Sequence, residues 1–207
     1  MNVDYSLLVN WFGLFGIAVF AISGALDAAR KGMDILGFML IGTATGLGGG
    51  TIRDVLLGLT PVYWIKDPTF IALCLIVTSI TYFVVPLLAS RTRALVWMDA
   101  LGISLFCVTG TGIALSQSAP PLVAICMGVI TATFGGIIRD VLCSESLILG
   151  QRELYVTATV FGASTFYFLT WLELPSAVAA IASFTLAFLL RAVAIIWKVQ
   201  IPSYKKR

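Results

Sequence analysis

The chain has 207 residues, of which 59% are hydrophobic and only 11% charged, and its mean hydropathy is +1.02. A soluble domain carries about 25% charged residues, so this composition excludes an ordinary soluble domain and indicates an all-α integral membrane protein. The net charge of +3 does not indicate a nucleic-acid partner, and the absence of histidine removes the commonest metal ligand and general base.

Apolar stretches of about 20 residues predict membrane-spanning helices. We expect one membrane domain over residues 1–207 with seven such helices, at 7–27, 35–59, 69–89, 95–116, 121–143, 154–172 and 175–197. No Lys or Arg precedes Arg30, so we expect no cleavable signal peptide. The cysteines lack metal-ligand spacing and are predicted to be free buried thiols: Cys74, Cys107, Cys126 and Cys143.

The basic residues predict how the chain is oriented. They follow the first, third, fifth and seventh predicted helices: Arg30, Lys31, Arg91, Arg93, Arg152, and Lys198, Lys205, Lys206 and Arg207 in the tail 198–207. The opposite set of connections holds Lys66 alone. Because Lys and Arg in short loops face the cytoplasm, we expect the N-terminus outside and the C-terminus, with its basic tail, in the cytoplasm.

A charged motif occurs twice, as GGTIRDVL at 49–56 and as GGIIRDVL at 135–142, an offset of 86 residues. Other matched pairs at this offset are Gly16 with Gly102, Phe20 with Phe106, Gly24 with Gly110, Gly42 with Gly128 and Thr45 with Thr131. We therefore predict two copies of a three-helix unit, 7–90 and 95–172, with 175–197 as an additional helix. Three helices per unit give the second copy the opposite orientation, which is the inverted repeat of many transport proteins.

Glycines gather in the second and fifth predicted helices, at Gly48, Gly49 and Gly50 and at Gly135 and Gly136. A glycine inside a helix costs about 1 kcal/mol relative to alanine, so these positions predict kinks, and the second helix is expected to bend or unwind. Thr51 and Asp54 have the spacing of a capping box for a second half-helix. Small residues also recur at every fourth position, which indicates close helix packing: Gly42 and Gly46, and Gly128 and Ala132. The pattern fits packing alone as well as packing combined with a kinked pore helix.

Four charged residues lie inside these apolar helices: Arg53, Asp54, Arg139 and Asp140. Neighbouring side chains project about 100° apart on a helix, so we expect cross pairs instead, Arg53 with Asp140 and Arg139 with Asp54, near the middle of the membrane. Such pairs fit both static salt bridges and a gate in a polar path. Further pore candidates are Asp99, Ser23 and Thr109. Arg191 is expected to extend to the cytoplasmic interface.

The doubled motif, 48–54 and 135–140, together with the predicted helix count, resembles the prokaryotic branch of the trimeric intracellular cation (TRIC) channel family, whose sequence domain is also labelled a glycine-transporter domain. The resemblance covers residues 7 to about 195. It implies a homotrimer in the plasma (cell inner) membrane of a prokaryote, with a hydrophilic pore in each subunit that prefers potassium over sodium. The implied pore residues are Gly48, Gly49, Gly50, Arg53 and Asp54, and Gly135, Gly136, Arg139 and Asp140. Phe134 replaces the first glycine of the second motif, so a shallower kink is expected there.

We therefore expect a channel for potassium and other monovalent cations, without a cofactor, that is gated by the intramembrane arginines and aspartates. The alternative is a secondary transporter of glycine or another small amino acid, in which Arg53 or Arg139 holds the carboxylate. A structural or assembly protein is disfavoured by the buried charges. An enzyme is disfavoured because no nucleophile–base constellation is present.

Overall fold

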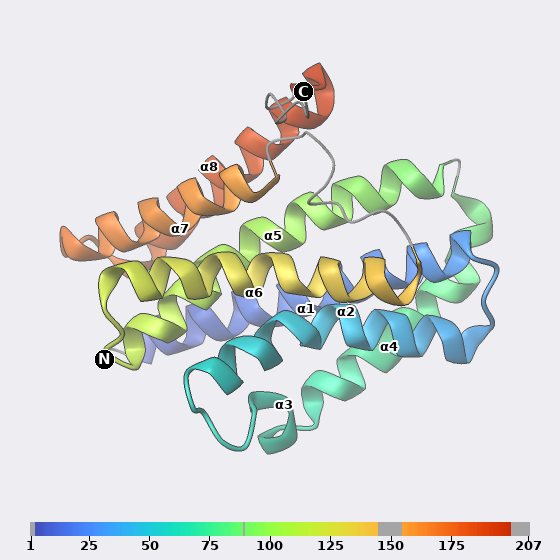
Figure 1. The fold of residues 1–207 in the computed structure, drawn as a ribbon, viewed down its shortest axis with the longest axis horizontal. Coiled ribbons are helices and arrows are strands. Elements are labelled where there is room, and N and C mark those ends of the chain that lie inside the picture. The colour runs from blue at the N-terminus through green and yellow to red at the C-terminus, as the bar shows by residue number, and fades with distance from the viewer. Residues whose placement is uncertain (1–2, 89, 145–154, 200–207) are drawn as a thin grey trace, which may run out of the picture.

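The computed structural model describes residues 3–88, 90–144 and 155–199, with side chains described from residue 9 onward. Every regular element among these residues is helical (Figure 1). In chain order the elements are α1 (Val3–Arg30), α2 (Ile35–Leu56), α3 (Tyr63–Lys66), α4 (Thr69–Val84), the 3-10 turn η1 (Val85–Leu87), α5 (Arg91–Ser116), α6 (Pro121–Leu142), α7 (Tyr155–Trp171) and α8 (Ser176–Trp197). Each of the seven predicted stretches coincides with one of the long helices, whereas the short helix α3 was not predicted.

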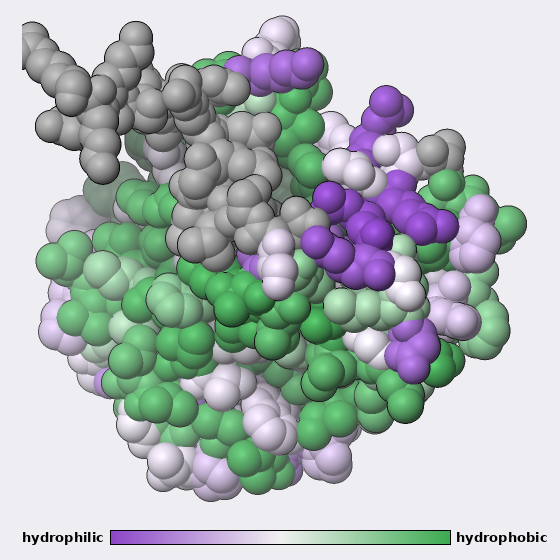
Figure 2. Space-filling view, turned by 45° about the vertical axis from the view of Figure 1, so that its right-hand side comes forward, coloured by the Kyte–Doolittle hydropathy of each residue, from purple (hydrophilic) through white to green (hydrophobic). Residues whose placement is uncertain are grey.

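Six helices in the described part of the chain are long and apolar enough to cross a membrane. The described part of α7 has 17 residues, so the count of seven spans stays a prediction. The exposed surface is apolar, with Leu36 68% exposed, Leu40 66% and Leu122 72%. Figure 2 shows this apolar surface together with a group of hydrophilic side chains at one end of the bundle. Because apolar side chains of this size face lipid at little cost, the chain is a multi-pass membrane protein.

Local sequence signals explain where several helices begin. The side chain of Asp34 accepts a hydrogen bond from the Gly37 N–H at 2.8 Å and caps α2. Ser90 caps α5 in the same way, and α6 starts at a proline, which has no N–H to leave unpaired. Before α4, hydrogen bonds from the Thr69 side chain and backbone lower the pKa of Asp67 from its ordinary value.

The centre of the molecule is formed by α1 against α5 and by α2 against α6. The rings of Phe20 and Phe106 meet edge to face with centroids 5.0 Å apart, and each ring lies over a glycine of the opposite helix, Gly102 and Gly16 respectively. Helix α4 covers α1 and α2, α7 covers α5 and α6, and α8 packs on α5 and α7 (Figure 1). Helices α1 and α5 are therefore the most buried, whereas α2 and α6 each expose one apolar face and turn their charged residues inward, away from lipid.

The expected unwinding of the second helix is wrong, because α2 is one continuous helix from Ile35 to Leu56 and α6 is equally unbroken. Thr51 forms no capping box, since its hydroxyl donates to the Leu47 carbonyl within the helix at 2.8 Å. The glycines allow close approach of backbones instead: a Cβ at Gly49 would collide with the carbonyl oxygen of Thr131. Packing between helices therefore offsets their low helix propensity. A bend within an unbroken helix stays a prediction.

The small residues at every fourth position lie at helix contacts. A Cβ at Gly42 would collide with Thr78 of α4, one at Gly46 would lie 3.0 Å from a carbonyl of α1, and one at Gly128 would collide with Thr111 of α5. Ala132 is fully buried.

Two smaller expectations are wrong. Cys126 is exposed, although the other three cysteines are buried as free thiols. The Arg191 side chain does not extend to an interface, since it is buried with its guanidinium 5.3 Å from the Tyr155 ring centroid.

Candidate functional site

The crossing of α2 and α6 determines where the four motif charges lie. The helices run antiparallel (Figure 1), with Gly49 against the Thr131 carbonyl and Gly135 against the Thr45 carbonyl. Arg53 and Arg139 each lie a few residues beyond this crossing, in opposite directions, which separates them by about 18 Å along the helices at ~1.5 Å per residue. The predicted cross pairs, Arg53 with Asp140 and Arg139 with Asp54, are therefore wrong.

Each arginine instead pairs with the aspartate that follows it. Nε and Nη2 of Arg53 donate to Asp54 Oδ1 at 2.9 and 2.7 Å. The second carboxylate oxygen of Asp54 accepts from the backbone N–H of Tyr63 at 2.9 Å, and the Arg53 guanidinium lies 5.5 Å from the Tyr63 ring centroid. Adjacent residues meet because the long arginine side chain folds back, a freedom that a projection by helical angle ignores.

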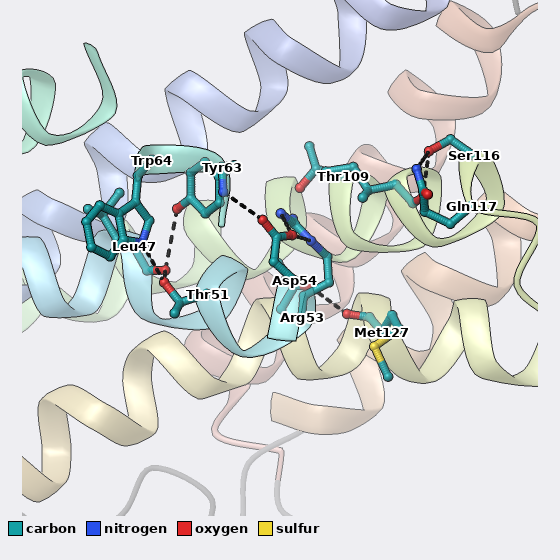
Figure 3. A network of polar contacts seen from close by, with 12 residues as sticks. Leu47, Thr51, Arg53, Asp54, Tyr63, Trp64, Thr109, Ser116, Gln117 and Met127 are labelled. Atoms are coloured by element: carbon teal, nitrogen blue, oxygen red, sulfur yellow. Dashed lines mark hydrogen bonds and ion pairs between the residues drawn. The ribbon is translucent and has the colours of Figure 1, made fainter. Parts of the chain in front are cut away.

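The short helix α3 positions Tyr63 at this pair. It is attached to α2 by a 2.9 Å hydrogen bond from the Trp64 indole N–H to the Thr51 hydroxyl (Figure 3). We call Arg53, Asp54 and Tyr63 the Arg53 cluster.

A cavity of about 90 Å³ opens beside Arg53. Its lining comes from α1, α2, α3, α4 and α5: Val9, Asn10, Gly13, Ile17, Gly50, Arg53, Tyr63, Phe70, Phe106, Thr109 and Ile113. Figure 3 shows Thr109 of α5 near the Arg53 guanidinium. The structure therefore brings Thr109 and Gly50, two of the predicted site residues, to one cavity with Arg53.

The second arginine has more partners. Nη1 of Arg139 donates to Asp99 Oδ1 at 2.9 Å and to the Ser23 hydroxyl at 2.6 Å, and Nε and Nη2 donate to Asp140 Oδ1 at 3.0 and 2.8 Å. Asp27 Oδ2 lies 3.9 Å from Nε. We call these five residues the Arg139 cluster. It brings three predicted site residues, Asp99, Ser23 and Asp140, to Arg139.

The Arg139 cluster is closed to solvent, since the side chains of Arg139 and Asp99 are 1% and 2% exposed. Burial of a guanidinium is tolerable only with charge partners and filled hydrogen bonds. Asp27 also pairs with Arg30 at 2.8 Å, which links the cluster to the basic end of the bundle.

Asp27 and Tyr63 were not among the predicted site residues. The residue that matches Asp27 at the offset of 86 is Ile113, so comparing the two repeats does not identify Asp27. Its position three residues before Arg30 on one helix does predict an ion pair. Tyr63 lies in a connection that was given no structure.

The remaining glycines lie apart from one another. Gly48 lines an apolar groove beside Ile138, away from Arg53. A Cβ at Gly136 would lie 3.0 Å from the Tyr155 hydroxyl and 3.6 Å from Asp99. Within the described ranges, no group of His, Cys, Asp and Glu side chains is arranged to hold a metal ion.

Comparison with protein families gives two matches to one model, described as glycine transporter, at residues 10–86 and 96–171. The chain is 38% identical over 205 residues to the inner membrane protein YadS of Escherichia coli K12, covering 96% of this chain and 97% of that one. It is 39% identical over 207 residues to a membrane protein of Vibrio cholerae, covering 98% and 84%. Both relatives are described as UPF0126 proteins.

Solved structures also match nearly the whole chain. A TRIC trimeric intracellular cation channel orthologue from Rhodobacter sphaeroides has 47% identity and a TM-score of 0.91, over 93% of this chain and 99% of that one. A trimeric intracellular cation channel from C. elegans, at 16% identity and a TM-score of 0.61 over 90% of each chain, shares the fold. This chain belongs to the prokaryotic branch of the trimeric intracellular cation channel family, whose sequence domain is described as glycine transporter.

Proposed function

We propose that the protein is a channel for monovalent cations that prefers potassium, with a hydrophilic path in each subunit of a homotrimer. The likeness to the Rhodobacter sphaeroides channel supports the class of function, because it extends over 93% of this chain at 47% identity. The similar solved structures are described as cation channels, which supports a channel rather than an enzyme.

The observation that carries the proposal is the placement of two buried arginine–aspartate pairs on opposite sides of the α2–α6 crossing. A path along these helices meets Arg53 from one face of the membrane and Arg139 from the other. The carboxylates of Asp54 and Asp140 neutralise the guanidinium groups, so neither arginine repels a passing cation.

The gate lies at the narrowest part of this path. The contact of Gly49 and Gly135 with α6 and α2 closes the middle, and the Arg139 cluster closes one end. Opening separates the helices at the crossing and moves Arg139 away from Asp99, which requires the helices to bend where the glycines lie.

We further propose that residues 7–90 and 95–172 are inverted repeats, with 175–197 as the extra helix. The paired contacts of Gly16 with Phe106 and Gly102 with Phe20, and the two matches to one family model, support this division. The description of the Escherichia coli relative as an inner membrane protein supports a bacterial inner membrane. The basic residues in alternate connections support an N-terminus outside and a C-terminus in the cytoplasm. Most of the basic tail 198–207 lies outside the described residues.

The test compares ion conduction with amino-acid uptake in liposomes that contain the purified protein. We expect single-channel potassium currents larger than sodium currents and no saturable uptake of labelled glycine. Arg139→Gln is expected to change the open probability, whereas the matched control Arg93→Gln, in an exposed position, is expected to leave it unchanged. Saturable glycine uptake driven by a sodium or proton gradient, without currents, would replace the channel by a transporter.

A further inference from the structure

The surroundings of the two arginines differ in one respect that the repeat makes visible. Asp99 and Asp27 surround Arg139, and an offset of 86 residues relates them to Gly13 and Ile113. Both of these uncharged residues line the cavity beside Arg53. The cavity therefore lies at Arg53 where the Arg139 cluster holds the carboxylates of Asp99 and Asp27.

The Arg53 guanidinium is only partly satisfied. Its side chain is 6% exposed, and its Nε and Nη2 both donate to Asp54 Oδ1. Among the described residues, no hydrogen bond is formed by Arg53 Nη1, the nitrogen whose counterpart in Arg139 donates to Asp99 and Ser23. Arg53 Nη1 keeps some accessible surface, since it is not among the fully buried atoms that lack a partner, so its N–H groups can donate to an acceptor that enters the cavity.

The other walls of the cavity define the size and class of the occupant. About 90 Å³ is room for several waters or for a small organic anion. Ile17, Phe70 and Phe106 contribute apolar walls, and Thr109 contributes a hydroxyl. Apolar walls beside the N–H groups of a guanidinium suit a carboxylate with a short alkyl chain.

We propose that the cavity beside Arg53 binds a small monocarboxylate such as acetate or propionate, whose carboxylate takes at Arg53 the place that Asp99 takes at Arg139. This site goes beyond the proposed channel function, since binding at it can be measured without any ion flux. If the protein conducts ions but binds no carboxylate, only the binding site is wrong. If it binds a carboxylate but conducts no ions, only the channel is wrong.

The structure offers a direct test at Gly13. A Cβ added there meets no atom within 4 Å, so a side chain fits the open space. Gly13→Asp installs a carboxylate at the position that corresponds to Asp99, where it fills the cavity and neutralises the same nitrogen. Gly13→Asn has the same shape without the charge and is the matched control.

Binding is measured by ligand-observed NMR and by thermal shift on the purified full-length protein, in chloride-free buffer with gluconate, an anion too large for the cavity. We expect acetate and propionate to bind to the wild type and to raise its Tm as their concentration rises. Gly13→Asp is expected to weaken acetate binding about ten- to a hundredfold, the loss of one charge-assisted hydrogen bond, and Gly13→Asn by less. Without ligand, Gly13→Asp is expected to have a higher Tm than Gly13→Asn.

Three results would overturn the proposal. The first is no acetate or propionate binding to the wild type. The second is binding to Gly13→Asp with unchanged affinity. The third is chloride binding equal to that of acetate at the same site, which would assign the cavity to anions in general. A Tm of Gly13→Asp below that of Gly13→Asn would count against the placement of the carboxylate even if binding could not be measured.

Discussion

Arg53 and Arg139 occupy matching places in the sequence but carry different numbers of charge partners. Arginine stays charged even when buried, so its stability inside the membrane depends on the carboxylates beside it. Among the residues that the structure describes, Arg139 has the carboxylates of Asp99 and Asp140 within hydrogen-bond distance, whereas Arg53 has only that of Asp54. Arg139 is therefore held by two carboxylates on one side of the α2–α6 crossing, whereas Arg53 is held by one on the other side.

This difference predicts unequal costs of removing the two charges. Arg139→Gln removes the hydrogen bonds that Arg139 donates to two buried carboxylates, Asp99 and Asp140, and is expected to cost about 3–5 kcal/mol, which lowers the Tm by roughly 10 °C. Arg53→Gln removes the hydrogen bonds to one carboxylate, that of Asp54, and is expected to lower the Tm by less than Arg139→Gln does. Thermal unfolding of both variants in the same detergent tests the order, and a larger loss for Arg53→Gln would show that the Arg139 cluster is not the stronger contact.

Asp99 is the residue that distinguishes the two clusters, and it predicts an effect on gating. Asp99→Asn keeps the shape of the side chain but removes its charge, which weakens the contact that holds Arg139 in the closed arrangement. We expect a higher open probability in bilayer recordings, at a conductance close to the wild type. Asp67→Asn is the control, since Asp67 is exposed in a loop, and an unchanged open probability in Asp99→Asn would remove Asp99 from the gate.

At the scale of the helices, neighbouring glycines are expected to differ sharply. Alanine at Gly49 would collide with the backbone carbonyl of Thr131, and alanine at Gly135 with that of Thr45, and backbone cannot move aside locally. Each substitution is expected to cost about 1–3 kcal/mol. Gly48→Ala meets only the flexible end of the Ile138 side chain and is expected to be nearly neutral. Thermal unfolding of the three variants checks this, and equal losses would mean that helix propensity rather than the crossing explains the glycines.

The helices themselves could be predicted from the sequence, because apolar stretches of about 20 residues have one stable arrangement in lipid. Asp34 and Ser90 also had the side chains that cap the helices which follow them. The break in α2 was predicted wrongly because helix propensity counts the cost of Gly49 and not the contact with α6 that its missing side chain allows.

The sequence predicts which charged residues belong to the site but not how they pair. Arg53, Asp54, Arg139 and Asp140 were recognisable from their position in apolar sequence, but their pairing depends on the antiparallel crossing and on the folded-back arginine side chain, which the sequence does not express. Asp27 joins Arg139 through the contact of α1 with α6, across more than 100 residues of chain.

For the whole molecule, the hydrophilic end in Figure 2 and the apolar surface around it define how the bundle sits in a bilayer. Exposed basic residues at this end include Lys31, Arg91 and Arg93. Short loops rich in Lys and Arg stay in the cytoplasm, so this end is expected to face inward and the connection that holds Lys66 outward.

Cysteine labelling in intact cells tests this orientation. In a Cys126→Ser background the remaining native cysteines are buried, so a single introduced cysteine reports its own side of the membrane. Lys66→Cys is expected to react with a membrane-impermeant maleimide in spheroplasts, whereas Arg93→Cys is expected to react only after the membrane is permeabilised. Both positions are exposed, so a difference in labelling reports the side of the membrane rather than burial. The reverse pattern would invert the bundle and place the Arg139 cluster, which Asp27 and Arg30 link to the basic end, on the outer side.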